Sequence, residues 1–293
     1  MSSLELKNIY KSFLNKNVLA DVNLTFQPEM IYGLFGCNGA GKSTLLNIIA
    51  SRILTDGGEV FYDHQSVWEY DDLMAKIYLV DSNDMYYPGM KLSKIIADTA
   101  GFYGEFDQEY ALELSEKFEL NLDQKYAKLS TGYKTIFKLI MSLCVPAEYV
   151  LLDEPVLGLD SQHRKLFYQE LLNTYTKKPR TFIIATHLID EISQIIQRVL
   201  IMQNGKIVVN QEVEELLAEA YLVLGSEEDL APYIHDLHVI GHEKLGNLHG
   251  YYILGELPAE LTQQTTVQIE TLSLDQVFVH LIQDEEGDAY VNN

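Results

Sequence analysis

The sequence predicts an α/β protein with a mainly parallel core sheet, an antiparallel β portion, a helical subdomain and a small α+β C-terminal domain. Buried-type strands alternate with helices, alternating strands occur near the N-terminus, and the charge balance changes late in the chain. A strand expected at Met30–Phe35 precedes a helix at Ser43–Ala50. Strands at Tyr149–Leu152 and Thr181–Ala185 flank a helix at Ser161–Tyr175. Apolar strands separated by helices are typical of a buried parallel sheet.

The antiparallel portion is predicted from the alternation of apolar and polar residues. Leu4–Ile9 and Val18–Phe26 show this alternation. Asp56-Gly57-Gly58 predicts a hairpin turn before a strand at Glu59–Tyr62. A second hairpin is expected across Gln203-Asn204-Gly205.

The helical subdomain is expected at about residues 82–148, because the apolar spacing there becomes helical. Its helices are predicted at Leu92–Tyr103, Gln108–Phe118 and Tyr133–Leu143.

The charge distribution divides the chain into residues 1–210 and residues 211–293. Of the formal net charge of −22, the second part carries −16, from 17 acidic side chains and one basic side chain, Lys244. This acidic domain is expected to have the ferredoxin-like order strand–helix–strand–strand–helix–strand, followed by a helix at Leu274–Ile282. The strands are predicted at Tyr221–Leu224, His238–Lys244, Gly250–Leu254 and Val267–Glu270.

The composition excludes several classes of function. Strong negative charge repels nucleic acid phosphates, so no nucleic acid partner is expected. No run approaches the roughly 18 apolar residues that span a bilayer, and no signal peptide is expected. Cys37 and Cys144 are isolated thiols, as in reducing compartments. We therefore expect a cytoplasmic protein.

A glycine-rich loop carries the strongest motif, GxxxxGK[ST]. Between an apolar strand and a helix, such a loop wraps its backbone N–H groups around phosphates. Lys42 would supply charge to the outer phosphates, and the Ser43 hydroxyl would bind Mg²⁺. The loop residues are Gly36, Cys37, Asn38, Gly39, Ala40, Gly41, Lys42, Ser43 and Thr44.

A pair of carboxylates follows the apolar strand at Tyr149–Leu152. Two acids at a strand end are costly unless a cation or hydrogen bonds compensate. Asp153 is therefore predicted to hold Mg²⁺, and Glu154 to orient or deprotonate an attacking water. A solvated strand end is the alternative for these two residues alone.

The segment Leu129-Ser130-Thr131-Gly132-Tyr133 resembles the signature, usually LSGGQ, of the ATP-binding cassette (ABC) family. It keeps Ser130 and Gly132, but Thr131 and Tyr133 replace the first glycine and the glutamine. The segment also predicts an ordinary helix N-cap, and both interpretations can hold.

Three more positions match ABC motifs, and the resemblance covers about Leu4–Val209. Asp160 ends the D-loop, and His187 matches the switch histidine that contacts the γ-phosphate. Phe13 aligns with the aromatic residue that stacks on adenine, although an ordinary hairpin residue is the alternative. The resemblance implies ATP hydrolysis with ATP and Mg²⁺ as cofactors.

Asp81 departs from the family pattern. The family usually has glutamine at the end of the strand Lys76–Val80, where it contacts Mg²⁺ and senses the membrane partner. Asp81 has the chemistry to ligate Mg²⁺, but it adds negative charge near the phosphates. The departure puts the usual coupling geometry in doubt.

The resemblance implies a subunit that works in a pair. In the family, two cassettes form a head-to-tail dimer that sandwiches ATP, so a homodimer or a heterodimer with another ABC subunit is expected. Separate transmembrane subunits would form the pore and hold the chain at the inner face of the cell membrane. Met85, Tyr86, Tyr87 and Met90 offer a surface for them, and about half of these side chains are expected to fill the core instead.

The direction of transport is predicted from one short segment. Thr271–Phe278 resembles the "SLEDVF" ending of peptide, antibiotic and drug exporter ATPases, so export is expected. The alternatives are an importer ATPase and a soluble or regulatory ABC ATPase not engaged in transport. The single cassette and the negative charge disfavour the soluble classes, while Asp81 leaves a regulatory cassette open.

Overall fold

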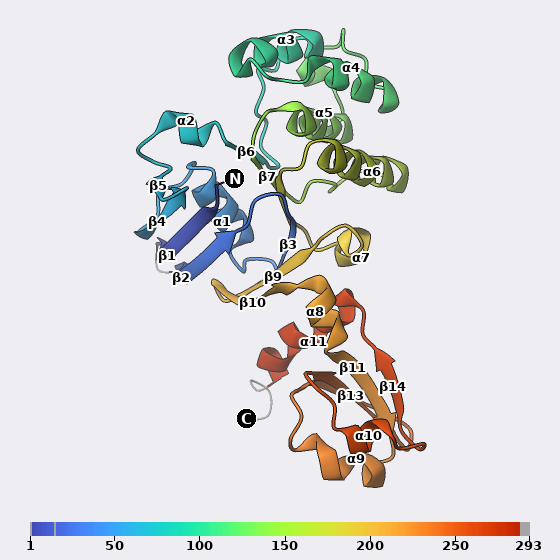
Figure 1. Cartoon of the computed structure of the whole chain (residues 1–293). Coiled ribbons are helices and arrows are strands. Elements are labelled where there is room, and N and C mark those ends of the chain that lie inside the picture. The colour runs from blue at the N-terminus through green and yellow to red at the C-terminus, as the bar shows by residue number, and fades with distance from the viewer. Residues whose placement is uncertain (1, 15, 288–293) are drawn as a thin grey trace.

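The computed structural model describes residues 2–14 and 16–287 and contains a six-stranded sheet at its centre (Figure 1). The strand order is β10-β9-β3-β8-β7-β6, and all neighbours except β9 and β10 are parallel. The mainly parallel core is therefore confirmed. The strands are β3 (Ile31–Phe35), β6 (Ile77–Val80), β7 (Tyr149–Asp153), β8 (Thr181–Ala185), β9 (Arg198–Gln203) and β10 (Lys206–Glu212).

An antiparallel sheet, ordered β2-β1-β4-β5, packs beside this core. One expected turn is wrong, because Gly57 and Gly58 belong to β4, and Gly57 pairs in register with Tyr10 of β1. A Cβ on Gly58 would lie 2.1 Å from the carbonyl oxygen of Asn8, so Gly58 permits close approach of two strands at an irregular register. The strands are β1 (Leu4–Phe13), β2 (Lys16–Phe26), β4 (Gly57–Tyr62) and β5 (Gln65–Ser66).

The helical subdomain lies at one end of the core sheet, where α3, α4, α5 and α6 gather (Figure 1). Polar side chains accept backbone N–H groups at the starts of these helices: Asp107 caps α4, Ser130 caps α5 and Asp160 caps α6. The helices up to this part of the chain are α1 (Lys42–Ile49), α2 (Asp71–Met74), α3 (Leu92–Tyr103), α4 (Gln108–Lys117), the 3₁₀ helix η1 (Tyr126–Lys128), α5 (Thr131–Cys144), α6 (Ser161–Lys177) and α7 (Ile189–Ile192).

The C-terminal region contains a separate four-stranded antiparallel sheet, ordered β12-β13-β11-β14. The elements follow the expected strand–helix–strand–strand–helix–strand order. They are α8 (Val213–Ala218), β11 (Ala220–Gly225), α9 (Glu227–Ile234), β12 (Val239–Leu245), β13 (Leu248–Leu254), α10 (Ala259–Thr262), β14 (Gln268–Thr271) and α11 (Leu274–Gly287).

The C-terminal region shares a hydrophobic core with the central sheet. Leu274 and Val277 of α11 are buried in the cluster that also contains Phe35 of β3. The rings of Phe35 and Phe278 meet edge to face, with centroids 6.0 Å apart. Among the described residues, no helix has the length and apolar character required to cross a membrane.

Candidate nucleotide site

The candidate site lies where the carboxyl ends of parallel strands meet the start of α1. The glycine-rich loop leaves β3 and enters α1 at Lys42. Asp153 ends β7 and pairs in register with Ala185 of β8, and His187 follows shortly after β8. Ligand sites in open α/β sheets lie at this edge of the sheet.

The loop backbone approaches its neighbours too closely for side chains at two positions. Gly36 has φ +156°, and a Cβ there would lie 2.3 Å from the carbonyl oxygen of Met202. Gly41 has φ +112°, and its Cβ would lie 2.8 Å from the carbonyl oxygen of Val18. The loop therefore takes a conformation that glycine permits and other residues resist.

Lys42 is folded back onto the loop that precedes it. The side chain is buried, and Nζ donates to the carbonyl oxygens of Gly36 at 2.6 Å and Cys37 at 3.2 Å. Burial lowers the pKa of Lys42, and the nearby carboxylates of Glu154 and Asp153 partly oppose that shift. A cationic ammonium group is thus placed inside a loop of the kind that receives phosphates.

A cavity of about 280 Å³ runs along this loop. Lys16 lines it, and a Cβ on Gly39 would lie 3.9 Å from Lys16 Nζ. Lys16, the first residue of β2, was not among the residues predicted from the sequence, although its positive charge two residues ahead of the strand expected at Val18–Phe26 was a signal. The cavity is lined by Lys16, Val18, Asn38, Gly39, Gly41, Lys42, Ser43, Thr44, Asp153 and Glu154.

Asp153 has the features expected of a carboxylate that binds a cation. Its Oδ1 is buried and has no hydrogen-bond partner among the described residues. Burial raises the pKa of Asp153, and the carboxylates of Glu154 and Asp81 raise it further, while a hydrogen bond with Ser43 lowers it. Orphaned buried acceptors are rare in proteins, and a hard cation satisfies this one with oxygen ligands. The residues present therefore fit Mg²⁺.

The structure brings Glu154 and His187 together. Oε2 of Glu154 lies 3.0 Å from His187 Nδ1 and accepts from Thr186 Oγ1 at 3.2 Å. Glu154 has φ +47°, and its N–H donates to the carbonyl oxygen of Ala185 at 2.8 Å. A non-glycine residue in this conformation is often found at functional sites.

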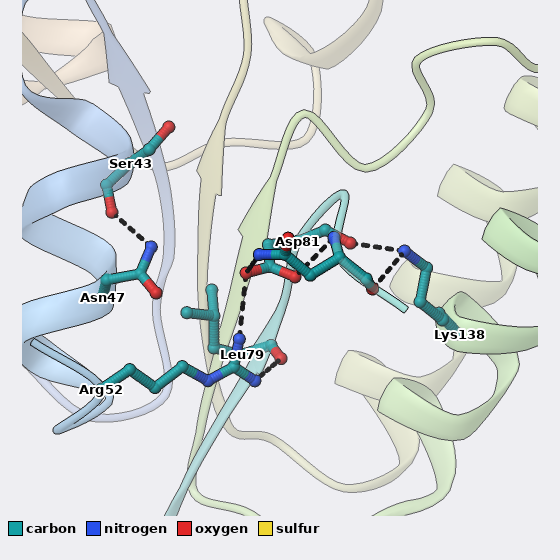
Figure 2. A network of polar contacts seen from close by, with 7 residues as sticks. Ser43, Asn47, Arg52, Leu79, Asp81 and Lys138 are labelled. Atoms are coloured by element: carbon teal, nitrogen blue, oxygen red, sulfur yellow. Dashed lines mark hydrogen bonds and ion pairs between the residues drawn. The ribbon is translucent and has the colours of Figure 1, made fainter. Parts of the chain in front are cut away.

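Asp81 is predicted to ligate Mg²⁺, but in the structure its carboxylate pairs with an arginine. Its carboxylate is buried and pairs with Arg52, with Nη1 3.0 Å from Oδ2 (Figure 2). Asn83 adds two hydrogen bonds to the same carboxylate, at 3.0 and 2.9 Å. Ligation of Mg²⁺ by Asp81 stays a prediction, and the sequence analysis missed Arg52.

The remaining predicted residues lie on three other segments. Ser130 caps α5, and a Cβ on Gly132 would lie 3.6 Å from the carbonyl oxygen of Gly158, next to the predicted D-loop. Asp160 caps α6. Phe13 is 45% exposed at the end of β1, where it pairs in register with Lys16 beside the cavity.

A family profile described as "ABC transporter" matches residues 19–157. The chain is 27% identical over 216 residues to the ABC transporter ATP-binding protein YtrB of Bacillus subtilis, which covers 74% of each chain. It is 26% identical over 297 residues to the sulfate/thiosulfate import ATP-binding protein CysA of Halalkalibacterium halodurans, covering 98% of this chain and 77% of that protein.

Solved ABC cassettes share the fold. The structure of the ATP binding subunit of an ABC transporter matches with a TM-score of 0.66 at 22% identity, covering 72% of this chain and 90% of that one. The dimeric post-hydrolysis state of the cassette MJ0796, bound to ADP and Pi, has a TM-score of 0.63 at 24% identity, covering 72% of this chain and 98% of that one. The chain is therefore an ATPase with the ATP-binding cassette fold, and residues 19–157 carry its match to the ABC transporter family.

Proposed function

We propose that this ATPase is the energy-coupling subunit of a transporter whose transmembrane subunits are separate polypeptides. The observation that carries the proposal is the convergence of the phosphate loop, Asp153 and the Glu154–His187 pair at one sheet edge. The names of the similar proteins YtrB and CysA support the transport role.

Each group at this edge has a proposed role in hydrolysis. The loop from Gly36 to Thr44 cradles the phosphates, and Lys42 exchanges its loop carbonyls for phosphate oxygens. Ser43 and Asp153 hold Mg²⁺, which neutralises charge on the phosphates when bound. Phe13 stacks on adenine from the end of β1.

Glu154 is proposed as the general base. Its carboxylate takes a proton from the water that attacks the γ-phosphate, and His187 holds the carboxylate and contacts that phosphate. Thr186 donates a second hydrogen bond, which restricts the orientation of Glu154. The chemistry is mainly positioning and electrostatic stabilisation.

We infer that two cassettes complete each site. Ser130, Gly132 and Asp160 of a partner chain would face the phosphate loop, in a homodimer or in a heterodimer with another ABC subunit. Ser130 caps the N-terminus of α5, a helix of 14 residues, and Gly132 lies in the first turn of that helix. A helix N-terminus of this kind suits an anionic γ-phosphate.

Transmembrane subunits are proposed to dock at the segment Ser82–Met90. Tyr86 packs its ring against Tyr126 and Phe137, so it belongs mainly to the subdomain core. Tyr87 is 72% exposed and remains available to a partner. Docking there would hold the chain at the inner face of the membrane.

Export is the direction that we propose, because Thr271–Phe278 resembles the ending of exporter ATPases. An importer is the second candidate, since CysA, which is named for sulfate/thiosulfate import, is similar over 98% of this chain. We also propose that residues 1–210 form the cassette and residues 211–293 an acidic domain that packs on it, since α11 contributes to the cassette core.

Isolation of the chain from membranes, with mass identification of the companion subunits, tests the proposal. Co-purification with a membrane-spanning partner that stimulates ATP hydrolysis is the expected result. Recovery only as a water-soluble ATPase that no membrane fraction stimulates would contradict the transporter role. Substrate movement into or out of sealed vesicles with ATP outside would then decide between export and import.

A further inference from the structure

Asp81 is held from two sides by cations that come from different parts of the fold (Figure 2). Arg52 follows α1, and its Nη1 lies 3.0 Å from Asp81 Oδ2 while Nη2 donates to the carbonyl oxygen of Leu79 at 2.9 Å. Lys138 of α5 donates Nζ to the carbonyl oxygens of Asp81 at 2.5 Å and Asn83 at 3.2 Å. The end of β6 is therefore tied to α1 by Arg52 and to α5 by Lys138.

Asp81 also lies beside Asp153, the carboxylate that is predicted to hold Mg²⁺. The parallel register pairs Val80 with Leu152, so Asp81 and Asp153 follow at the same edge of neighbouring strands. Asp81 is 5% exposed, which leaves little water to screen its charge. An unpaired carboxylate at this place would repel the ATP phosphates, and Arg52 supplies the compensating charge.

We propose that Arg52 is a positioning residue of the nucleotide site, which supports nucleotide binding by neutralising Asp81 where the end of β6 meets the phosphate-loop helix. The guanidinium suits this task because its planar fork contacts a side-chain oxygen and a backbone oxygen together. This inference rests on the proposed role of Asp153 in the site. It explains how the chain accommodates Asp81 where the ABC family usually has glutamine.

Two variants of the full chain test the proposal: Arg52→Gln, and Arg52→Gln combined with Asp81→Gln. Affinity for a nonhydrolysable ATP analogue with Mg²⁺ is measured by calorimetry, and the unfolding midpoint is measured without nucleotide. Arg52→Gln is expected to weaken the affinity about tenfold and to lower the midpoint by about 3–6 °C. The double variant carries neither charge, so its affinity is expected within about threefold of the wild type.

Lys76→Gln is the matched control, because Lys76 precedes β6 and pairs with Glu148 at 2.9 Å at the opposite end of the strand. It should leave the nucleotide affinity unchanged. Arg52→Lys keeps the charge without the fork, and its affinity is expected between those of the wild type and Arg52→Gln, which keeps the test open if the glutamine variant does not fold.

Wild-type affinity in Arg52→Gln would overturn the proposal. So would a double variant as weak as the single variant, because Arg52 would then act through a group other than Asp81. Failure of the wild-type chain itself to bind the analogue would refute the nucleotide site instead, and the two failures are thus distinguishable.

Discussion

The two ends of the parallel sheet differ in how their polar groups are satisfied. At the carboxyl end, Asp153 Oδ1 has no hydrogen-bond partner among the described residues, and Lys42 turns back onto its own loop. At the amino end, Glu148 is bound by Lys76 at 2.9 Å and by the hydroxyl of Tyr62. The carboxylate of Glu148 thus has its partners within the protein, whereas Asp153 Oδ1 has none among the described residues.

Cavity size alone would direct attention to the wrong end. A hollow of about 560 Å³ lies at the amino end, lined in part by Tyr62, Glu148 and Tyr149, whereas the phosphate-loop cavity has about 280 Å³. In the larger hollow, Glu148 is already paired with Lys76 and with the hydroxyl of Tyr62. The unpaired, buried oxygen of Asp153 therefore distinguishes the phosphate-loop end better than cavity volume does.

The same substitution at the two ends of β7 gives the sharpest contrast. Glu154→Gln removes the proposed general base and should lower ATP turnover by about 10²- to 10⁴-fold while nucleotide binding persists. Glu148→Gln, directly before β7, should change turnover little. Steady-state phosphate release and analogue binding check both variants. Wild-type turnover in Glu154→Gln would remove that residue from the mechanism.

Substitution of one lysine at each end of the sheet compares the two ends by their effect on ATP affinity. Lys42→Ala removes the buried ammonium from the phosphate loop and should weaken ATP affinity by roughly 10- to 100-fold, because charge-assisted hydrogen bonds are lost. Lys76→Ala, at the amino end, should bind ATP normally. Equal calorimetric affinities for the two variants would contradict the cradle assignment.

Asp153→Asn should stabilise the nucleotide-free protein at pH 7 while impairing turnover. Burial raises the pKa of Asp153 above its ordinary 3.8, so the folded state holds this proton more tightly than the unfolded state. The contribution of the Asp153 carboxyl to the free energy of unfolding is therefore lost as the pH rises through the raised pKa. Asparagine does not ionise, so the variant does not lose this contribution. Its unfolding midpoint should exceed that of the wild type by about 2–4 °C.

The pH dependence supplies the control for this variant. The difference in midpoint should vanish below pH 3.8, where the carboxyl is protonated in both states. A gap that persists unchanged at that pH would show that the stability gain has another cause than ionisation.

The smallest effect is expected from the amino-end ion pair. Lys76 and Glu148 are 45% and 37% exposed at their side chains, so solvent screens their attraction. Lys76→Gln should therefore lower the free energy of unfolding by less than about 1 kcal/mol, measured by urea denaturation. A loss several times larger would mean that the stability of the amino end depends on this ion pair, which would contradict the proposed difference between the two ends.

The sequence predicted the parallel core well because its strands are short, continuous apolar runs with clear ends. Thr181–Ala185 and the helix at Leu92–Tyr103 have the predicted bounds. Asp56–Gly58 was misjudged because glycine also occurs where strands approach closely, and the sequence does not reveal that neighbour. Similarly, the strong charge of residues 211–293 gave no sign that Leu274 and Val277 complete the cassette core.

The candidate site was predictable where a motif fixes the spacing, and its supporting residues were not. The phosphate loop and the Asp153–Glu154 pair are contiguous in sequence, so their patterns are recognisable. Arg52 and Lys16 reach the site from segments without a motif, and only the folded arrangement shows their partners. The roles of the individual site residues remain predictions for the experiments above.

The contact between Phe35 and Phe278 has a consequence for the order of folding. Phe35 is the last residue of the strand that leads into the phosphate loop, and its aromatic neighbour is synthesised more than 200 residues later. During translation this part of the core stays uncovered until α11 emerges from the ribosome. Ribosome-bound chains that end before α11 should therefore expose apolar surface to chaperones, and the cassette should reach its native packing only after α11 has been synthesised.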